Sequence, residues 1–503
     1  MKLSITTLAA MLSVCANAQW TVINLNPAGA TESRASAVRD GQQVGSAVVG
    51  GIRRASLWTG TAASWVNLSS LTAIASEAYG VANGQQVGYM EHYTGQFTWN
   101  GEKRAGIWTG TSGSFVSLHP EGYAAEATVA YATDGQQQVG VFQTYDLWPA
   151  IMWNGTAGSM QNLHPGYTGQ FEHTTSHARG VDAGIQVGGC EINDQQFPNP
   201  TWTPHAFMWA GSAGSWIDLH PAWASRSWGY GVSGNQQVGV GQVRSYHAVL
   251  WTGSAASAVD LNPTGAASSW AFAVHSGEQA GDAPTGTLSR AALWMGTPGS
   301  HIDLHAALPG GSYSASTARG IWHNGPLTHV VGSGMTTGFN PHQTALMWVS
   351  RAVAPASFSM VRGSVFSGNL ASLQNSENNR LVMRPGFVFS VGEPPVQVRL
   401  NGTAPTASPN GFSFSVESSA SFGSAEQKVW LWNYVLGDYE LLDTRLATTS
   451  DDVVTVTVRT NPARFIQPGA LAIRALVSFR AVGPAFAYPW SGRIDKVWWN
   501  FPG

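Results

Sequence analysis

Four histidines recur at equivalent places along the chain, and imidazoles are common ligands in transition-metal sites. Each follows a leucine at the end of a strand-like segment: His119, His164, His220 and His305. If these segments are outer strands of sheets arranged around an axis, adjacent equivalents lie about 17 Å apart, whereas metal–nitrogen bonds are about 2 Å long. Asn26 and Asn262 hold the same slot and proline follows most copies, so we expect the slot to form turns.

Carboxylates recur beside this slot, and paired carboxylates are typical of general acid–base chemistry. They stand one residue before the same leucine: Asp218, Asp260 and Asp303. Other copies carry an asparagine there: Asn24, Asn67 and Asn162. Because an amide cannot replace a general acid or base, we expect turn or edge hydrogen bonds from this position. The sequence also lacks a Ser-His-Asp pattern, a phosphate loop, HExxH and paired CxxC motifs.

Tryptophan is a third candidate, since an indole face stacks well on a sugar ring. Seven tryptophans follow an aliphatic residue once in every repeat, which favours packing between sheets: Trp58, Trp108, Trp153, Trp209, Trp251, Trp294 and Trp348. Others fall outside this pattern and stay open as ligand-stacking residues: Trp65, Trp99, Trp202, Trp223, Trp228 and Trp270.

A repeat with three signatures must position these residues. A Gln-Gln-Val-Gly turn, in varying form, occurs at 41–45, 84–88, 136–140, 184–188, 235–239, 277–281 and 328–332. The aliphatic-Trp pair follows it, and then a strand ending in Asn-Leu or Asp-Leu. The seventh copy of that strand, 20–27, stands at the start, and the last repeat stops after Trp348. A closed ring explains this permutation, since the first strand then completes the last sheet.

We therefore predict an all-β protein with a seven-bladed β-propeller whose N-terminal strand closes the last blade. Upstream of each Gln-Gln-Val-Gly the chain reads small, variable, small, β-branched, as in 35–38 and 178–181. We expect this strand to be innermost, where small residues let the sheets approach. Its middle residue changes from blade to blade, which gives our candidate ligand-binding residues: Tyr79, Tyr131, Arg179, Tyr230 and Arg319. Packing against the neighbouring blade is the alternative role.

The segments His205-Ala206-Phe207-Met208-Trp209 and His247-Ala248-Val249-Leu250-Trp251, with the Gln-Gln-Val-Gly turns, resemble the bacterial extracellular repeats called the HAF family. The resemblance covers about residues 20–351. It implies an extracellular location and no settled activity.

The N-terminus predicts export. Lys2 precedes an apolar stretch, and Ala16-Asn17-Ala18 offers small residues to a signal peptidase, so we expect a signal peptide at 1–18. Lipidation at Cys15 is the alternative. After cleavage only Cys190 remains, so we expect no intrachain disulfide. We find no later apolar run long enough to span a membrane.

The repeat pattern ends at residue 351, so we divide the mature chain into a propeller at 19–351 and a β-sandwich, similar to a jelly roll, at 352–503. The strand-like runs of the second part are 358–366, 380–383, 386–391, 396–400, 412–417, 428–434, 453–459, 470–480 and 493–499. Around 428–434, 443–445 and 494–499 the sequence loosely resembles carbohydrate-binding modules of exported bacterial proteins. The likeness implies binding but assigns no residue.

Our leading expectation is a secreted, non-catalytic, monomeric protein that binds polysaccharide or another extracellular or cell-surface ligand. An extracellular polysaccharide lyase or hydrolase using the axial funnel stays open, as does a structural surface component. The net charge of −3 offers no broad field for nucleic acid or anionic lipid. We expect no metal and no cofactor.

Overall fold

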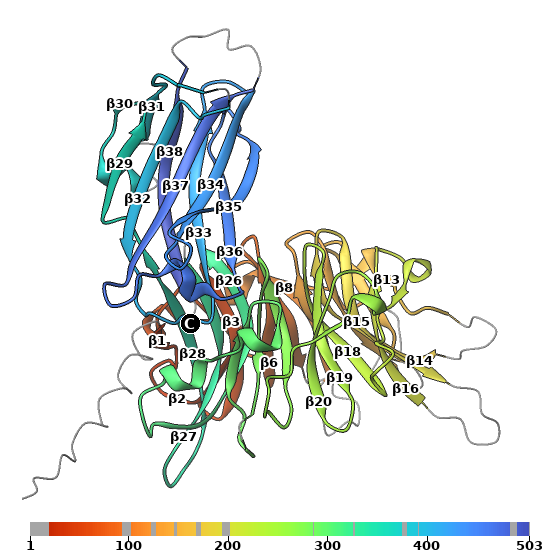
Figure 1. Ribbon diagram of the computed structural model, residues 1–503. Coiled ribbons are helices and arrows are strands. Elements are labelled where there is room, and N and C mark those ends of the chain that lie inside the picture. The colour runs from red at the N-terminus through yellow and green to blue at the C-terminus, as the bar shows by residue number, and fades with distance from the viewer. Residues whose placement is uncertain are drawn as a thin grey trace, which may run out of the picture. The chain divides into compact units, whose positions relative to one another are not determined.

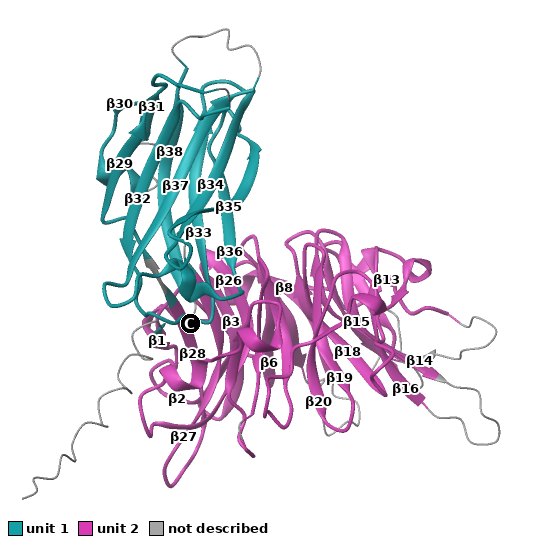
Figure 2. Cartoon of the chain, viewed as in Figure 1, with its two compact units in different colours: residues 1–21, 325–327, 350–503 teal, residues 22–324, 328–349 magenta. Residues whose placement is uncertain are grey.

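The protein is all-β in the computed structural model (Figure 1). The structure describes residues 20–92, 102–121, 127–144, 148–166, 173–193, 202–284, 286–324, 327–374, 380–390, 392–482 and 490–501. The expected signal peptide, 1–18, lies outside these residues. Figure 2 shows the two compact units. The first, which we call the repeat unit, comprises residues 22–324 and 328–349; the C-terminal unit comprises 350–503 with 1–21 and 325–327.

Four sequence repeats each form a separate four-stranded antiparallel sheet. These sheets are β2 (Ala30–Arg39), β3 (Gln42–Val49), β4 (Ile52–Trp58) and β5 (Val66–Asn67); β14 (His173–Asp182), β15 (Ile185–Asn193), β16 (Trp202–Trp209) and β17 (Ile217–Asp218); β18 (Arg226–Ser233), β19 (Gln236–Gln242), β20 (Tyr246–Trp251) and β21 (Val259–Asp260); and β22 (Trp270–His275), β23 (Glu278–Asp282), β24 (Ala291–Trp294) and β25 (Ile302–Asp303).

Two further repeats join into one sheet through a single residue pair, Ala127 with Lys103. Their strands are β6 (Ala75–Ala82), β7 (Gln85–His92), β8 (Glu102–Trp108) and β9 (Val116–Ser117), then β10 (Ala127–Thr133), β11 (Gln138–Gln143), β12 (Ala150–Trp153) and β13 (Gln161–Asn162). The last repeat contributes β26 (Tyr313–Asn324), β27 (Leu327–Thr336) and β28 (Gln343–Val353), and β1 (Trp20–Asn24) pairs with β28.

Short 3-10 turns join the third and fourth strands of six repeats. They are η2 (Ala62–Ser64), η3 (Ser112–Ser114), η4 (Ala157–Ser159), η5 (Ala213–Ser215), η6 (Ala255–Ser257) and η7 (Pro298–Ser300), and η8 (Leu304–Ala307) follows β25. The serine that ends each of η2 to η7 accepts a hydrogen bond from the residue after the repeat tryptophan, as Ser215 does from Ala210 at 2.9 Å. The turn therefore ties the end of the third strand to the start of the fourth.

The seven repeat tryptophans are all buried with no exposed surface, as predicted. The second Gln of the Gln-Gln-Val-Gly signature explains why that turn and the Trp-x-Gly turn occur together. In six repeats its side-chain oxygen accepts the glycine N–H of the Trp-x-Gly turn, at 2.7–2.8 Å. One side chain thus ties together two turns of the same sheet.

The first strands of the repeats contact one another in chain order: β2 with β6, then β10, β14, β18, β22 and β26, and β26 contacts β2. Small residues permit this approach, as predicted. A Cβ on Gly80 would lie 2.9 Å from the Cα of Ala132, and a Cβ on Gly320 would lie 2.9 Å from the Cα of Ala37. Any larger side chain at these positions would separate neighbouring strands.

A hydrogen bond that we call the latch joins each repeat to the next. An alanine N–H of the third strand donates to a serine or threonine hydroxyl on, or directly before, the first strand of the next repeat, at 2.8–3.0 Å. The seven pairs are Ala55–Ser76, Ala105–Thr128, Ala150–Ser176, Ala206–Ser227, Ala248–Ser269, Ala291–Ser316 and Ala345–Ser33. The seventh latch joins the last repeat to the first.

The C-terminal unit is a β-sandwich. One sheet runs β29 (Ser357–Arg362), β32 (Val396–Thr403), β37 (Ala472–Ala481), β34 (Ala425–Asn433), β35 (Asp438–Leu446); the other runs β30 (Ser364–Ser367), β31 (Leu381–Arg384), β38 (Gly492–Phe501), β33 (Phe412–Ala420), β36 (Asp452–Val458). The 3-10 turns η9 (Leu370–Leu373) and η10 (Pro462–Phe465) complete the unit. Buried alternate residues of both sheets, among them Val398, Phe414 and Trp499, form one core.

Two strand predictions in this unit were wrong, and one strand was not predicted. Of the run predicted at 386–391, the described residues 386–390 form no strand: Phe387 and Phe389 are each 90% exposed, and the flanking Pro385, Pro394 and Pro395 have no N–H for a ladder. The run predicted at 358–366 divides into β29 and β30 at Gly363, whose φ is +85°. β35 was not predicted from the sequence; four of its nine residues are charged and five are exposed, without a clear alternation.

Candidate functional site

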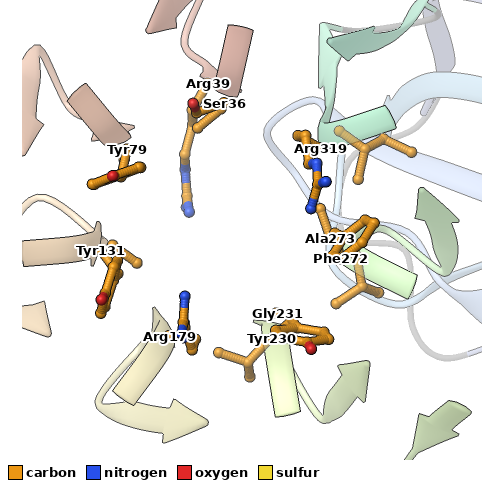
Figure 3. Close-up of a pocket in the computed structure, with 18 of the residues that line it drawn as sticks. Ser36, Arg39, Tyr79, Tyr131, Arg179, Tyr230, Gly231, Phe272, Ala273 and Arg319 are labelled. Atoms are coloured by element: carbon orange, nitrogen blue, oxygen red, sulfur yellow. The ribbon is translucent and has the colours of Figure 1, made fainter. Parts of the chain in front are cut away.

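A cavity of about 200 Å³ lies among the first strands of the repeat unit, with residues of β2, β6, β10, β14, β18, β22 and β26 in its wall (Figure 3). All five candidate residues of the sequence analysis line it: Tyr79, Tyr131, Arg179, Tyr230 and Arg319. Ser36 and Phe272 hold the same position on the two remaining strands and line it as well. The variable residue of every repeat therefore faces one shared space.

β-Bulges direct these side chains to the cavity. In six first strands the pairing register shifts at the variable residue, as between Ala178 and Gly180 on either side of Arg179. A bulge leaves one residue without a partner and re-aims its side chain. The glycine of Gln-Gln-Val-Gly makes room for it, because a Cβ on Gly188 would lie 1.8 Å from the carbonyl oxygen of His177.

An ion pair links β2 and β14 beside the cavity. Arg39 of β2 donates from Nη1 to Oδ1 of Asp182, on β14, at 3.4 Å. β2 and β14 are not adjacent in the order of first strands, so the pair spans the central space. Figure 3 shows the Arg39 side chain extending towards the middle of the cavity. Arg39 was not a sequence candidate, since it lies three residues beyond the variable position.

The other two arginines of the cavity lie against aromatic rings. The guanidinium of Arg179 is 4.4 Å from the ring centre of Tyr131, and that of Arg319 is 3.9 Å from the ring centre of Phe272. Each pair joins different repeats. Neither arginine forms an ion pair within the described part of the chain. Stacking on a neighbouring ring holds both cations at the cavity surface.

The tyrosines of the cavity are neutral hydrogen-bonding groups. Burial, with the Glu77 charge beside it, raises the pKa of the Tyr79 hydroxyl well above its usual range. Its hydroxyl donates to Oε2 of Glu77 at 3.3 Å. Burial also raises the pKa of Tyr230, although Arg179 and Arg319 oppose that shift. A phenol acting as a general base needs a lowered pKa, so these two residues suit binding better than proton abstraction.

Three of the recurring histidines, His119, His164 and His220, form turns through their backbone N–H groups, as predicted. The histidine rings also extend the latches. Nδ1 of His164 lies 2.8 Å from the latch hydroxyl of Ser176, and His119, His220 and His305 make the same contact to their latch hydroxyls. In two other repeats the latch serine donates instead to Asn Oδ1, as Ser269 does to Asn262 at 2.7 Å. Burial lowers the pKa of His119, His220 and His305, so a neutral ring presents an acceptor as asparagine does.

The recurring carboxylates and amides form turns, as predicted. Asp218 accepts the N–H of His220 at 2.7 Å, Asp260 accepts that of Asn262, and Asn24, Asn67 and Asn162 bond the same way. Asp303 accepts instead from Ala306, at 3.3 Å. Within the described ranges no three His, Cys, Asp or Glu side chains are grouped to hold a metal ion. Cys190 is buried, and its Sγ lies 3.8 Å from the carbonyl oxygen of Glu191.

The non-repeated tryptophans do not gather in the cavity. Trp228 lines a hollow next to it with Tyr131 and Arg179, and Trp270 lines another with Tyr230 and Arg319. Trp65 donates to Ser56 at 2.9 Å, and Trp223 is 38% exposed. Trp202 is half-buried in β16. Trp99 lies outside the described residues.

Sequence reasoning missed two polar clusters near the cavity. His275, which lines it, lies 2.8 Å from His323 between Nδ1 atoms, and His323 contacts Glu278 at 3.1 Å. Burial, with His323 as a second cause, lowers the pKa of His275 to about 4. Asp282 is 5% exposed and accepts the N–H of Ala318 at 3.2 Å. The sequence could have indicated Asp282, because this is the repeat in which an acidic residue directly follows the glycine of the Gln-Gln-Val-Gly signature.

Comparison with known proteins assigns no family. No protein-family model matches the chain, and no curated protein matches it. The β-propeller domain of the Trilobed protease from Pyrococcus furiosus is 6% identical with a TM-score of 0.40, over 63% of this chain and 94% of that one. The Pyrococcus horikoshii acylaminoacyl peptidase is 7% identical with a TM-score of 0.42, over 76% of this chain and 59% of that one.

A carbohydrate binding module of family 29 is 14% identical with a TM-score of 0.17, over 30% of this chain and 90% of that one. Likenesses this distant carry no functional argument. Among the described residues, no helix has the length and apolar character needed to cross a membrane.

Proposed function

We propose that the protein is a secreted, non-catalytic binding protein, built as a closed seven-bladed propeller that takes its ligand in the central cavity. One observation carries the binding proposal: a position that varies in chemistry from repeat to repeat is also the position that a bulge turns into the cavity. It carries Ser36, Tyr79, Tyr131, Arg179, Tyr230, Phe272 and Arg319. Around it, the latch and packing positions keep one residue type or one hydrogen-bonding role. A stable scaffold that varies at one shared surface is typical of recognition.

Closure of the ring rests on contacts between the last repeat and the first. β1 pairs with β28, and the N–H of Leu25 donates to the carbonyl oxygen of Ala345 at 2.9 Å. The latch from Ala345 to Ser33 is also 2.9 Å long. In a closed propeller this latch is equivalent to every other, so its loss should be as costly as the loss of any internal one.

The variant Ser33→Ala tests closure against Ser227→Ala, which removes the internal latch to Ala206. Each should lower the free energy of unfolding by about 1–3 kcal/mol, because a buried N–H loses its acceptor. Urea denaturation measures both, with Ser112→Ala, at an exposed position, as control. An unchanged Ser33→Ala beside a destabilised Ser227→Ala would argue for an open array.

A polysaccharide is the ligand class that the cavity favours, because tyrosine faces and hydroxyls suit sugar rings and their hydroxyl groups. An array of glycans and cell-wall polymers, followed by calorimetry on each hit, tests binding. We expect a hit that Tyr131→Ala weakens at least tenfold and that Leu71→Ala, an exposed control, leaves unchanged. Failure to bind any polymer at high micromolar concentration would remove this proposal.

The extracellular location accords with the predicted signal peptide and the HAF-like repeats, and both are part of the proposal. The same binding experiments separate it from its rivals. Release of reducing or unsaturated ends, lost in Arg179→Ala, would favour a lyase or hydrolase. Self-assembly into large particles without ligand, seen by sedimentation, would favour a structural component over the expected monomer.

A further inference from the structure

The central cavity carries an excess of positive charge. Its wall contains Arg39, Arg179 and Arg319 and no aspartate or glutamate. Asp182 neutralises Arg39. The buried Glu77 lies near the wall, and Arg34 neutralises it at 2.7 Å. Asp282 lies outside this wall and interacts electrostatically with Arg319, but burial raises the pKa of its carboxyl to about 7, so it offsets that charge only in part. Two guanidinium groups, those of Arg179 and Arg319, therefore face the cavity.

Both groups are held ready for a ligand. A ring covers one face of each guanidinium. Figure 3 shows Arg179 extending into the open space and Arg319 lying along the wall towards Phe272. Stacking leaves the N–H groups in the plane of the guanidinium, where they form a fork that matches a carboxylate or another oxyanion. Because the side chains are stacked before the ligand arrives, little rotamer freedom is lost on binding.

The aromatic side chains of the cavity could contact the uncharged part of a ligand. Tyr79 lies 5.6 Å from Tyr131 between ring centres, and Tyr230 lies 5.4 Å from Phe272. The cavity of about 200 Å³ is below the range of about 300–1,000 Å³ for drug-sized ligands, so it fits one sugar residue rather than a long chain segment.

Resting on the proposed binding function, we infer that the cavity recognises an acidic sugar residue, whose oxyanion pairs with Arg179 or Arg319 while its ring packs against the tyrosines. The overall charge of −3 does not oppose this. It excludes a broad field that gathers polyanions, whereas the cavity offers two local cations to one residue of a polymer.

The test uses the full exported chain and matched polymers. Polysaccharides that contain uronic acids are compared with the same polymers after reduction of their carboxylates to alcohols, and sulfated polymers are compared with their desulfated forms. We expect tight binding in one acidic arm and at least tenfold weaker binding of its neutral counterpart. The two arms distinguish a carboxylate from a sulfate ester.

Variants locate the anion. Arg179→Gln and Arg319→Gln should each weaken acidic-polymer binding, and the double variant should abolish it. Arg179→Lys should lose part of the affinity, because a lysine keeps the charge but not the fork. Arg226→Gln, an exposed arginine of β18 outside the wall, is the matched control and should bind normally. Thermal unfolding of each variant checks that the fold is intact.

The outcomes separate the two proposals. Equal binding of acidic and neutral forms, lost in Tyr131→Ala but kept in Arg179→Gln with Arg319→Gln, would overturn the acidic-sugar inference and keep the binding function. Acidic binding that survives the double arginine variant would place the anion elsewhere and overturn it too. Binding of no polymer in any arm would remove both.

Discussion

The contacts between sheets and the cavity of the repeat unit differ in how far their residues vary from repeat to repeat. Between the sheets, the same roles return seven times: a buried tryptophan, an alanine N–H and the hydroxyl that accepts it. At the cavity, the same backbone position carries serine, tyrosine, arginine or phenylalanine. The difference indicates that the contacts between sheets maintain the fold, while the cavity position accepts side chains of different chemistry.

The bulge is what allows this separation. Since the variable residue has no partner on the second strand, its side chain can change without altering the ladder hydrogen bonds. The neighbouring positions have no such freedom. They face another strand at close range, where a single added carbon would collide with backbone.

The largest expected effect comes from the position opposite the bulge. A Cβ on Gly239 would lie 1.9 Å from the carbonyl oxygen of Trp228, so Gly239→Ala must push two paired strands apart. We expect a loss of at least about 3 kcal/mol in the free energy of unfolding, measured by urea denaturation.

Gly158→Ala is the matched control, because nothing lies within 4 Å of a Cβ built there. Its stability should be unchanged or slightly higher. If Gly239→Ala were as stable as this control, the bulges would not depend on the signature glycines.

A gain rather than a loss of stability is expected from a substitution of the buried Asp282. Burial raises the pKa of Asp282 to about 7 from its usual 3.8, although Arg319 opposes the shift. Tyr230 lines the same hollow. Because the folded pKa is the higher one, the contribution of Asp282 to stability is fully present below pH 3.8 and is lost as pH rises through 7.

Asp282→Asn keeps an acceptor for the Ala318 N–H and never ionises. Relative to the native chain it should gain up to about 1.4 kcal/mol per pH unit as pH rises from 4 towards 7, and the gain should then level off. Thermal melts between pH 4 and pH 8 follow this change. If the difference in stability between Asp282→Asn and the native chain stayed constant with pH, Asp282 would have the same pKa in the folded and unfolded chains. Its burial would then carry no pH-dependent cost in stability.

The smallest effect concerns the histidine slot. If its imidazole serves as an acceptor for the latch hydroxyl, His164→Asn should be tolerated within about 0.5 kcal/mol, while His164→Leu should lose about 1 kcal/mol. Urea denaturation of the pair decides between them. Equal losses of stability in both variants would show that the imidazole ring itself is needed. The latch would then not depend on an acceptor role that histidine and asparagine share.

Much of this organisation can be predicted from local pattern. The seven Gln-Gln-Val-Gly turns, the buried tryptophans and the small residues of the first strands follow from periodicity, because residues with one role in every repeat meet the same environment. The five candidate residues follow from the exception to that rule. Pattern failed in the C-terminal unit, where a strand is predicted at 386–391 although the described residues 386–390 form none.

By itself the sequence determined which positions repeat and which vary, since this information is carried by residues close together in the chain. Only the tertiary structure decided where the varied side chains point and which distant groups they meet. The bulge at each first strand, the pairing of Arg39 with Asp182 and the shared acceptor role of histidine and asparagine all depend on neighbouring repeats. Contacts between residues far apart in the chain leave no periodic trace in either partner, so only the folded arrangement discloses them.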